Sequence, residues 1–170
     1  MDIVLVLLRL IHIFSGVFWA GGVFVMARFL MPAVAASQPE GNKFMQKFMG
    51  GGYVLAQTFA GPLAVLAGLI LYWKDSGGLS NGWIATPTGL GFTVGAIGGL
   101  VALFIGFFIT RTAATNMANL GKEIQMAGKP PTPDQLAKIK QFQETLVSST
   151  VWVAIALAIT VAAMAIARYL

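Results

Sequence analysis

The sequence predicts an all-α integral membrane protein, a four-helix bundle that forms a single transmembrane domain over residues 1–170. Hydrophobic residues make up 57% of the chain and charged residues 10%, whereas about a quarter of the residues of a soluble domain are charged. Four apolar stretches reach the roughly 20 residues that a helix needs to cross a bilayer. None alternates polar and apolar residues with period two, so a transmembrane β-barrel is excluded and the backbone is expected to be helical.

The four predicted spans cover residues 3–30, 52–73, 88–110 and 146–170. The first apolar stretch continues to Ala36, so its last turns are expected to leave the membrane or to tilt strongly. In the second span, Gly61-Pro62 predicts a kink, because proline removes a backbone hydrogen bond and clashes with the preceding turn.

Capping signals predict a long helical hairpin between the third and fourth spans. Thr86-Pro87 is typical of an N-cap followed by proline at the first helical position. The third helix is expected to continue past Arg111 and to end at Gly128. Thr132-Pro133-Asp134-Gln135 then predicts a capping box that starts the last helix.

Basic residues predict the orientation in the membrane, because cytoplasmic loops are enriched in Lys and Arg. Three basic residues lie on one side: Arg9, Lys74 and Arg168. Eight lie on the other: Arg28, Lys43, Lys47, Arg111, Lys122, Lys129, Lys138 and Lys140. We therefore expect both termini on the outer side of a bacterial inner membrane and the hairpin in the cytoplasm. Insertion explains the net charge of +5, so no nucleic-acid partner is expected, and the predicted surroundings are the lipid bilayer.

Missing residue types exclude several chemistries. The chain has no cysteine, which excludes disulfides, iron–sulfur clusters and thiolate zinc sites. No Asp or Glu falls within a span core, which disfavours carboxylate proton relays and carboxylate-coordinated ion transport. The methionines are scattered along the sequence, so they predict packing residues and no copper-binding cluster.

His12 is the single histidine and lies about nine residues, or about 13 Å, into the first span. An ionisable side chain at that depth normally faces the bundle interior. Two interpretations stay open: a neutral imidazole bonded to a neighbouring helix, or an axial ligand of haem iron. Ser15, Gly16 and Trp19 follow on the same helical face, and the small ones leave room for a flat macrocycle or for close helix packing.

Two further polar residues are candidates for the same site. Gln57 lies in the second span, and it is predicted, with Thr58, to be an in-membrane partner of His12 or of the backbone carbonyls that Pro62 leaves free. Arg28 is expected at the cytoplasmic interface, with contact to a haem propionate as the alternative. The predicted cofactor site therefore contains His12, Ser15, Gly16, Trp19, Arg28 and Gln57, with His12 as the metal ligand.

Glycines at four-residue spacing mark one face of the third span: Gly91, Gly95 and Gly99. Small residues at this spacing let helix backbones approach closely. A helix–helix contact is therefore the main prediction for this face, with a ligand groove as the alternative.

The first span contains three runs that carry a family resemblance: Leu10-Ile11-His12-Ile13-Phe14, Phe18-Trp19-Ala20-Gly21-Gly22-Val23-Phe24 and Arg28-Phe29-Leu30. They resemble the first helix of the HemJ-type membrane protoporphyrinogen oxidases and are similar to that of the copper-resistance CopD-like proteins. Those families place a His before a W-x-G-x-x-(F/Y) stretch, and in the HemJ type an Arg follows. The resemblance covers about the first 70 residues and the four-helix plan.

The resemblance implies a haem b site with His12 as iron ligand, Trp19 in its lining and Arg28 near its edge. The HemJ type also carries a lysine in the third helix that is tied to activity, and this sequence has no Lys between Ile84 and Phe108. What the resemblance implies is therefore a relative that uses this scaffold for haem binding or another membrane redox step.

Two functions are predicted. The first is a haem b-binding membrane protein in electron transfer or in porphyrin- or quinone-linked redox chemistry, with a membrane oxidoreductase as the candidate enzyme class. The alternative is a non-catalytic membrane subunit or oligomerising scaffold that packs through Gly91, Gly95 and Gly99. A homo-oligomer or a larger membrane complex is compatible with both, since two chains could each supply one His12 to a shared haem.

Overall fold

The computed structural model describes residues 2–170, and within this range all regular structure is helical. Met1 lies outside the described residues. Four continuous helical runs are long and apolar enough to cross a membrane: Ile3–Ala36, Glu40–Asp75, Pro87–Ala127 and Pro133–Tyr169. The predicted all-helical class is confirmed, and the four runs are those of a multi-pass membrane protein.

Each run contains a short segment with wider or tighter helical turns. The first comprises α1 (Ile3–Val25), the π-helical η1 (Met26–Leu30) and α2 (Met31–Ala36). The second comprises α3 (Glu40–Phe48), η2 (Met49–Tyr53) and α4 (Val54–Asp75). After the short α5 (Asn81–Ile84), the third comprises α6 (Pro87–Phe104), η3 (Ile105–Thr110) and α7 (Arg111–Ala127). The last comprises α8 (Pro133–Ile166) and the 3₁₀ turn η4 (Ala167–Tyr169).

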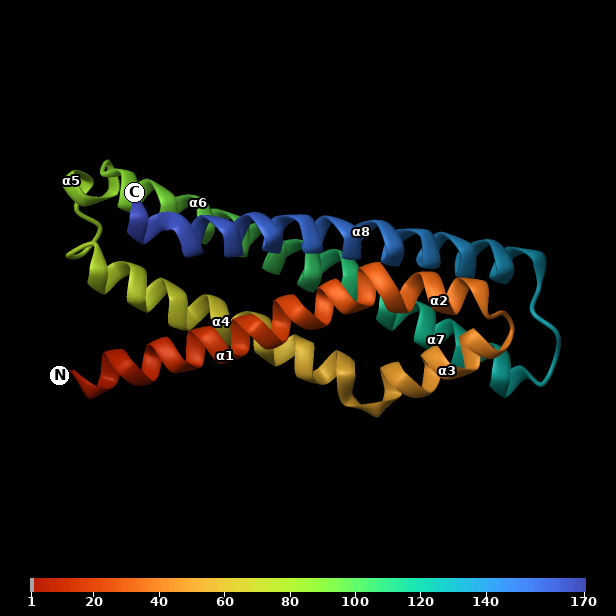
Figure 1. The fold of residues 1–170 in the computed structure, drawn as a ribbon. Coiled ribbons are helices and arrows are strands. Elements are labelled where there is room, and N and C mark those ends of the chain that lie inside the picture. The colour runs from red at the N-terminus through yellow and green to blue at the C-terminus, as the bar shows by residue number, and fades with distance from the viewer. Residues whose placement is uncertain (1) are drawn as a thin grey trace.

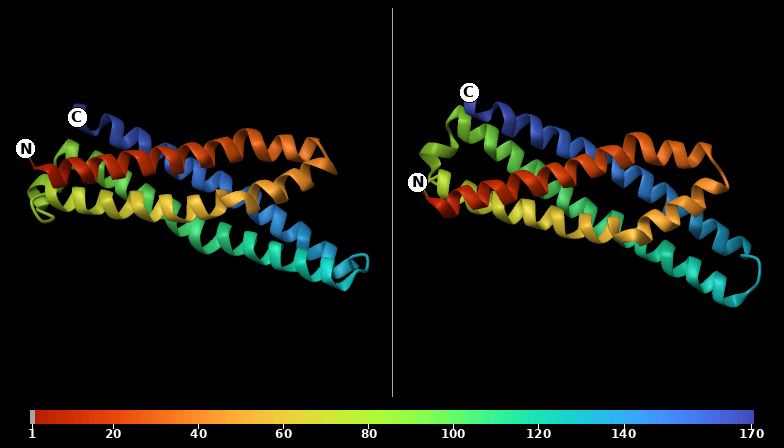
Figure 2. Two further views of the ribbon diagram at one scale, coloured as in Figure 1. Left: turned by 90° about the horizontal axis from the view of Figure 1, so that it is seen from below. Right: turned by 60° about the horizontal axis from the view of Figure 1, so that its bottom comes forward.

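The four runs form two helical pairs. Helix α1 packs mainly on α4, and α6 packs mainly on α8. Both termini and α5 lie at one end of the molecule, and the α2–α3 turn and the α7–α8 loop lie at the other (Figure 1). The pairs diverge towards the end that carries these two connections (Figure 2).

The predicted capping residues are confirmed. Thr86 Oγ1 accepts the Gly89 backbone N–H at 3.0 Å at the start of α6. Thr132 and Gln135 form the reciprocal capping box of α8, with bonds of 3.3 and 2.9 Å. Gly128 ends α7 with φ 60°, a left-handed conformation that glycine adopts without a steric penalty.

The second run differs from the prediction. It already begins with α3, which the sequence analysis did not predict. Its interruption lies at Gly52, where φ is 98°, while α4 continues through Pro62. Only glycine adopts such a φ readily, whereas the hydrogen bond that a proline removes is tolerated inside a membrane bundle.

The glycine face of α6 packs against α8 of the same chain. A Cβ atom at Gly95 would lie 2.6 Å from Met164 Cγ, and one at Gly98 would lie 2.5 Å from Thr160 Oγ1. At Gly91 it would lie 2.9 Å from the Ala167 Cβ. The predicted helix–helix contact is confirmed. The partner is α8 of the same chain, and Gly95 and Gly99 also line a cavity of the bundle, which is the setting that the alternative of a ligand groove requires.

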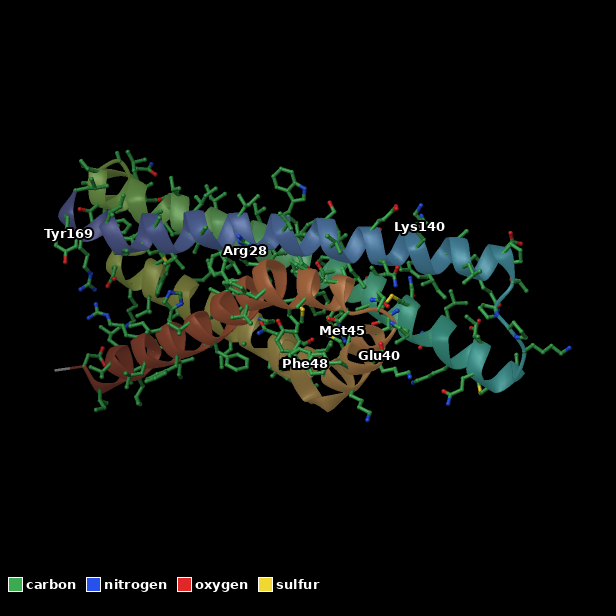
Figure 3. The ribbon with its side chains drawn as sticks, turned by 45° about the vertical axis from the view of Figure 1, so that its right-hand side comes forward. Arg28, Glu40, Met45, Phe48, Lys140 and Tyr169 are labelled. Atoms are coloured by element: carbon green, nitrogen blue, oxygen red, sulfur yellow. The ribbon has the colours of Figure 1, made fainter. Side chains whose placement is uncertain are left out.

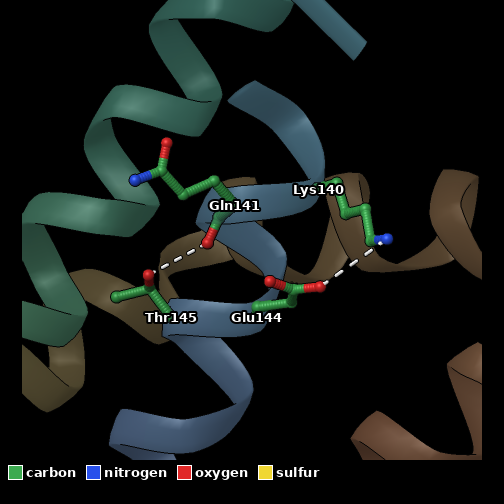
Figure 4. A network of polar contacts seen from close by, with 4 residues as sticks. All are labelled: Lys140, Gln141, Glu144 and Thr145. Atoms are coloured by element: carbon green, nitrogen blue, oxygen red, sulfur yellow. Dashed lines mark hydrogen bonds and ion pairs between the residues drawn. The ribbon is translucent and has the colours of Figure 1, made fainter. Parts of the chain in front are cut away.

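Helix α8 begins with a polar segment before its apolar part. Lys140 Nζ lies 4.0 Å from Glu144 Oε1, and Thr145 Oγ1 donates to the Gln141 carbonyl oxygen at 2.9 Å (Figure 4). The ion pair is largely exposed, as expected outside an apolar layer. The apolar part starts at Leu146, where the fourth span was predicted.

Candidate functional site

Two cavities lie inside the bundle on either side of Trp19. The terminal-end cavity has a volume of about 650 Å³ and is lined by residues that include His12, Gly68 and Met164. The hairpin-end cavity has a volume of about 350 Å³ and is lined by residues that include Gln57. Trp19 is 7% exposed and lines both. Both volumes fall within the roughly 300–1,000 Å³ of small-molecule sites.

His12 is held between α1 and α4. Its Nδ1 lies 2.7 Å from the carbonyl oxygen of Ala64. One turn further along α4, Gly68 leaves space for the ring, because a Cβ atom there would lie 2.7 Å from His12 Cε1. The half-buried ring also lines the terminal-end cavity. The imidazole is therefore fixed on one side by a helix backbone and open to a cavity on the other.

The acceptor determines which ring nitrogen carries the proton. A carbonyl oxygen only accepts hydrogen bonds, so His12 Nδ1 donates the proton in this contact. In the neutral ring Nε2 then keeps its lone pair. Metal-binding histidines almost always donate their other ring N–H to a carbonyl, carboxylate or water, which orients the ring and raises its basicity.

Two guanidinium groups line the same cavity. Arg9 lies three residues before His12 on α1, and Arg168 is contributed by η4 at the end of the last run. Arg9 Nη2 lies 3.7 Å from Asp75 Oδ1, and both side chains are partly exposed. Such an exposed pair is weak, and Asp75 lines the cavity together with the two arginines.

The remaining polar side chains of the cavity wall have partners within the protein. Tyr72 Oη and Thr93 Oγ1 share a hydrogen bond of 2.6 Å, and Thr160 Oγ1 donates to the Ala156 carbonyl oxygen at 2.9 Å. Trp83 packs edge-on against Tyr72, with ring centroids 5.5 Å apart. The hydroxyl groups of Tyr72 and Thr160 are thus engaged within the protein, and Trp83 contributes an aromatic wall.

The structure brings together three of the six predicted site residues. His12, Gly16 and Trp19 line the terminal-end cavity. Ser15 is buried, and its hydroxyl donates to the Ile11 carbonyl oxygen of its own helix. Ser15 therefore supports the local helix and does not line the cavity.

Of the two partners predicted for Gln57, the structure does not show His12. Gln57 lines the other cavity, beyond Trp19, and its Nε2 lies 3.5 Å from the Phe18 carbonyl oxygen. The place next to the imidazole is taken by the backbone of Ala64. A backbone acceptor has no side-chain signature, so the sequence analysis assigned the contact to the nearest polar side chain.

Arg28 lines neither cavity. Its guanidinium lies 5.9 Å from the Phe29 ring centroid, and the side chain is exposed. Figure 3 shows Arg28 well inward from the end that carries Tyr169, whose neighbour Arg168 lines the terminal-end cavity. The guanidinium groups beside the His12 cavity are therefore Arg9 and Arg168, which the sequence analysis used only for orientation.

Methionines that are distant in sequence line the hairpin-end cavity together: Met26, Met31, Met45, Met49 and Met117. These methionines are scattered along the sequence, and the fold brings them to the wall of one cavity. Within residues 2–170 no group of three or more His, Cys, Asp or Glu side chains could hold a metal ion.

Comparison of the chain with protein-family models, curated proteins and solved structures finds no match. The chemistry of the site is therefore argued from its geometry. One half-buried imidazole, a mostly apolar cavity of about 650 Å³ and the side chains of Arg9, Arg168 and Asp75 make up the site.

Proposed function

We propose that the protein binds haem b in the terminal-end cavity and uses it for electron transfer or for porphyrin- or quinone-linked redox chemistry. The proposal rests on the hydrogen bond of His12 and on its position at the cavity wall. Its Nδ1 proton is held by Ala64 at 2.7 Å, and its Nε2 is left for a ligand at the wall of a cavity of about 650 Å³. A neutral imidazole held in this way is the usual axial ligand of haem iron.

Other residues that line the cavity suit the carboxylates and the flat ring of haem. Arg9 and Arg168 are suited to pair with its carboxylates, since guanidinium groups bind carboxylates through charge-assisted hydrogen bonds. Gly16 and the face of Trp19 supply flat, apolar walls. The resemblance of the first helix to HemJ-type and CopD-like proteins supports the roles of His12 and Trp19, while Arg9 and Arg168 replace Arg28 in this proposal.

When bound, haem supplies reversible one-electron transfer. The protein's own residues orient the iron ligand, neutralise the acidic groups and exclude water from one side. The bond to Ala64 fixes the imidazole plane, because rotation of the ring would leave a buried N–H without an acceptor. Trp19 closes the inner end of the cavity and keeps the site separate from the hairpin-end cavity.

We propose that the protein lies in a bacterial inner membrane with both termini on the outer side and the α7–α8 hairpin in the cytoplasm. The support is the excess of basic residues in the connections at the hairpin end. In this orientation His12 and the terminal-end cavity belong to the outer half of the membrane. The electron partner would then approach Arg9 and Arg168 from the outer surface.

A visible absorption spectrum tests the proposal. Protein purified from haem-supplemented cells should show a Soret band and one haem per chain, and His12→Ala should lose both. Ser15→Ala is the matched control on the same helix, because Ser15 bonds only to its own helix. A wild-type protein without a Soret band after reconstitution with haem would remove the proposal.

A further inference from the structure

We propose that the thioether sulfur of Met164 is the second axial ligand of the iron, opposite His12. This inference rests on the proposed haem binding and goes beyond it, because it specifies a six-coordinate site made by one chain. A single histidine otherwise leaves a five-coordinate iron or a haem shared by two chains.

The position of His12 along the long axis of the bundle can be compared with positions on the other helices. On α4 the ring lies against Gly68. One turn further towards the termini, Tyr72 bonds to Thr93 of α6 at 2.6 Å. Helices α4 and α6 run in opposite directions, so one turn back along α4 corresponds to about one turn forward along α6. His12 therefore lies at about the depth of Ala96.

The contacts of α6 relate this position along the bundle axis to α8. Gly95 and Gly98 lie on either side of Ala96 in the sequence, and they pack against Met164 and Thr160 respectively. Met164 and His12 line the same cavity from different helices. The two side chains thus lie at similar depth on the walls of one space.

The two helical runs present matching pairs of side chains to this cavity. On α1, Arg9 lies one turn closer to the termini than His12, at three-residue spacing. On the last run, Arg168 lies one turn closer to the termini than Met164, at four-residue spacing. Residues at these spacings share a helix face, and all four line the cavity. Each wall thus offers an iron ligand and, nearer the termini, a cation for an acidic group.

Met164 is the suitable donor opposite His12. The hydroxyls of Tyr72 and Thr160 already have partners. The methionines other than Met164 that line a cavity belong to the hairpin-end cavity, beyond Trp19. Gly95 leaves the space that the Met164 side chain occupies, since a Cβ atom there would lie 2.6 Å from its Cγ. A thioether is a soft ligand, and histidine–methionine ligation raises the reduction potential of haem.

The test uses the full-length protein loaded with haem in nanodiscs, read by the spin state of the ferric iron and by the midpoint potential. Wild type should be low-spin with one haem per chain. Met164→Leu should keep the haem through His12, become high-spin and show a lower potential. Met164→His should be low-spin again, with a potential below that of wild type. Met31→Leu, at the other cavity, is the matched control and should behave as wild type.

Several results would overturn the assignment of Met164 and leave haem binding intact. They are a high-spin wild-type iron, a low-spin Met164→Leu variant with unchanged potential, or one haem for every two chains. If Met164→Leu loses its haem, Met164→His decides: recovery of a low-spin haem supports ligation at this position, and failure to recover it overturns it. A wild-type protein that binds no haem would instead remove the proposed function itself.

Discussion

His12 Nδ1 lies 2.7 Å from the carbonyl oxygen of Ala64, so the single histidine of the chain is oriented by the backbone of a neighbouring helix. Substituting the side chain of residue 64 leaves this acceptor in place. The position of the ring therefore depends on how closely α1 and α4 approach, and residues that control this distance should control ligand binding.

Gly68→Ala tests this dependence. The new Cβ atom would lie 2.7 Å from His12 Cε1 and 2.9 Å from its Nδ1, so the ring must shift away from Ala64. We expect haem affinity to fall about 10- to 100-fold, as when an outer partner of a metal ligand is lost. Titration of apoprotein with haem measures the change. Gly21→Ala, which meets nothing within 4 Å, should bind as wild type; equal affinity of Gly68→Ala would contradict the prediction.

Arg9 and Arg168 should recognise the acidic groups of the ligand. Wild type should bind haem more tightly than haem dimethyl ester, which lacks the carboxylates. The double variant Arg9→Gln and Arg168→Gln should lose most of this preference. Loss of one charge-assisted hydrogen bond of about 1.5 kcal/mol lowers the ratio of the two affinities roughly tenfold. Competition between the two ligands measures the ratio. Arg28→Gln is the control, and a preference that persists in the double variant would count against Arg9 and Arg168.

The α6–α8 contact should control stability within one chain. In Gly98→Ala the new Cβ atom would meet Thr160 Oγ1 at 2.5 Å and the Ala156 carbonyl oxygen at 3.2 Å. We expect a loss of about 1–3 kcal/mol in the free energy of unfolding, typical of overpacking. Unfolding in mixed detergent micelles measures it, with Gly106→Ala as the open-space control. The assignment of this face to α8 would be contradicted if the free energy of unfolding did not change. It would also be contradicted if only the oligomeric mass changed.

The break between α3 and α4 should depend on Gly52. Its φ of 98° is unfavourable for any residue with a Cβ atom, at a cost of about 1–2 kcal/mol. Gly52→Ala should therefore lower the unfolding free energy by that amount, although nothing lies within 4 Å of the added atom. Gly51→Ala has equal space without a positive φ, so its stability should stay at or above that of wild type. Equal stabilities of the two variants would exclude backbone strain as the cause.

Local sequence signals predicted the helices and their ends well. The caps at Thr86 and Thr132 and the stop at Gly128 use only neighbouring residues, so they can be read from a few positions. The break at Gly52 was missed because a run of three glycines does not show which one takes the positive φ.

The site was predicted only in the part that belongs to one helix. His12, Gly16 and Trp19 follow helical spacing on α1, so their common face was visible in the sequence. Their partners from other helices depend on packing depth, which residue spacing within one helix does not give. Thus the contact of His12 with Ala64 was missed, while Gln57 was included because of its residue type and Arg28 because of its residue type and the family resemblance.

Trp19 belongs to the buried core of the bundle, where it packs with Ala64, Ala102 and Leu157. Its indole also forms part of the wall of both hollows. A substitution at this one position would therefore alter the shape of two internal spaces at once, and any ligand that occupies either of them would meet the change.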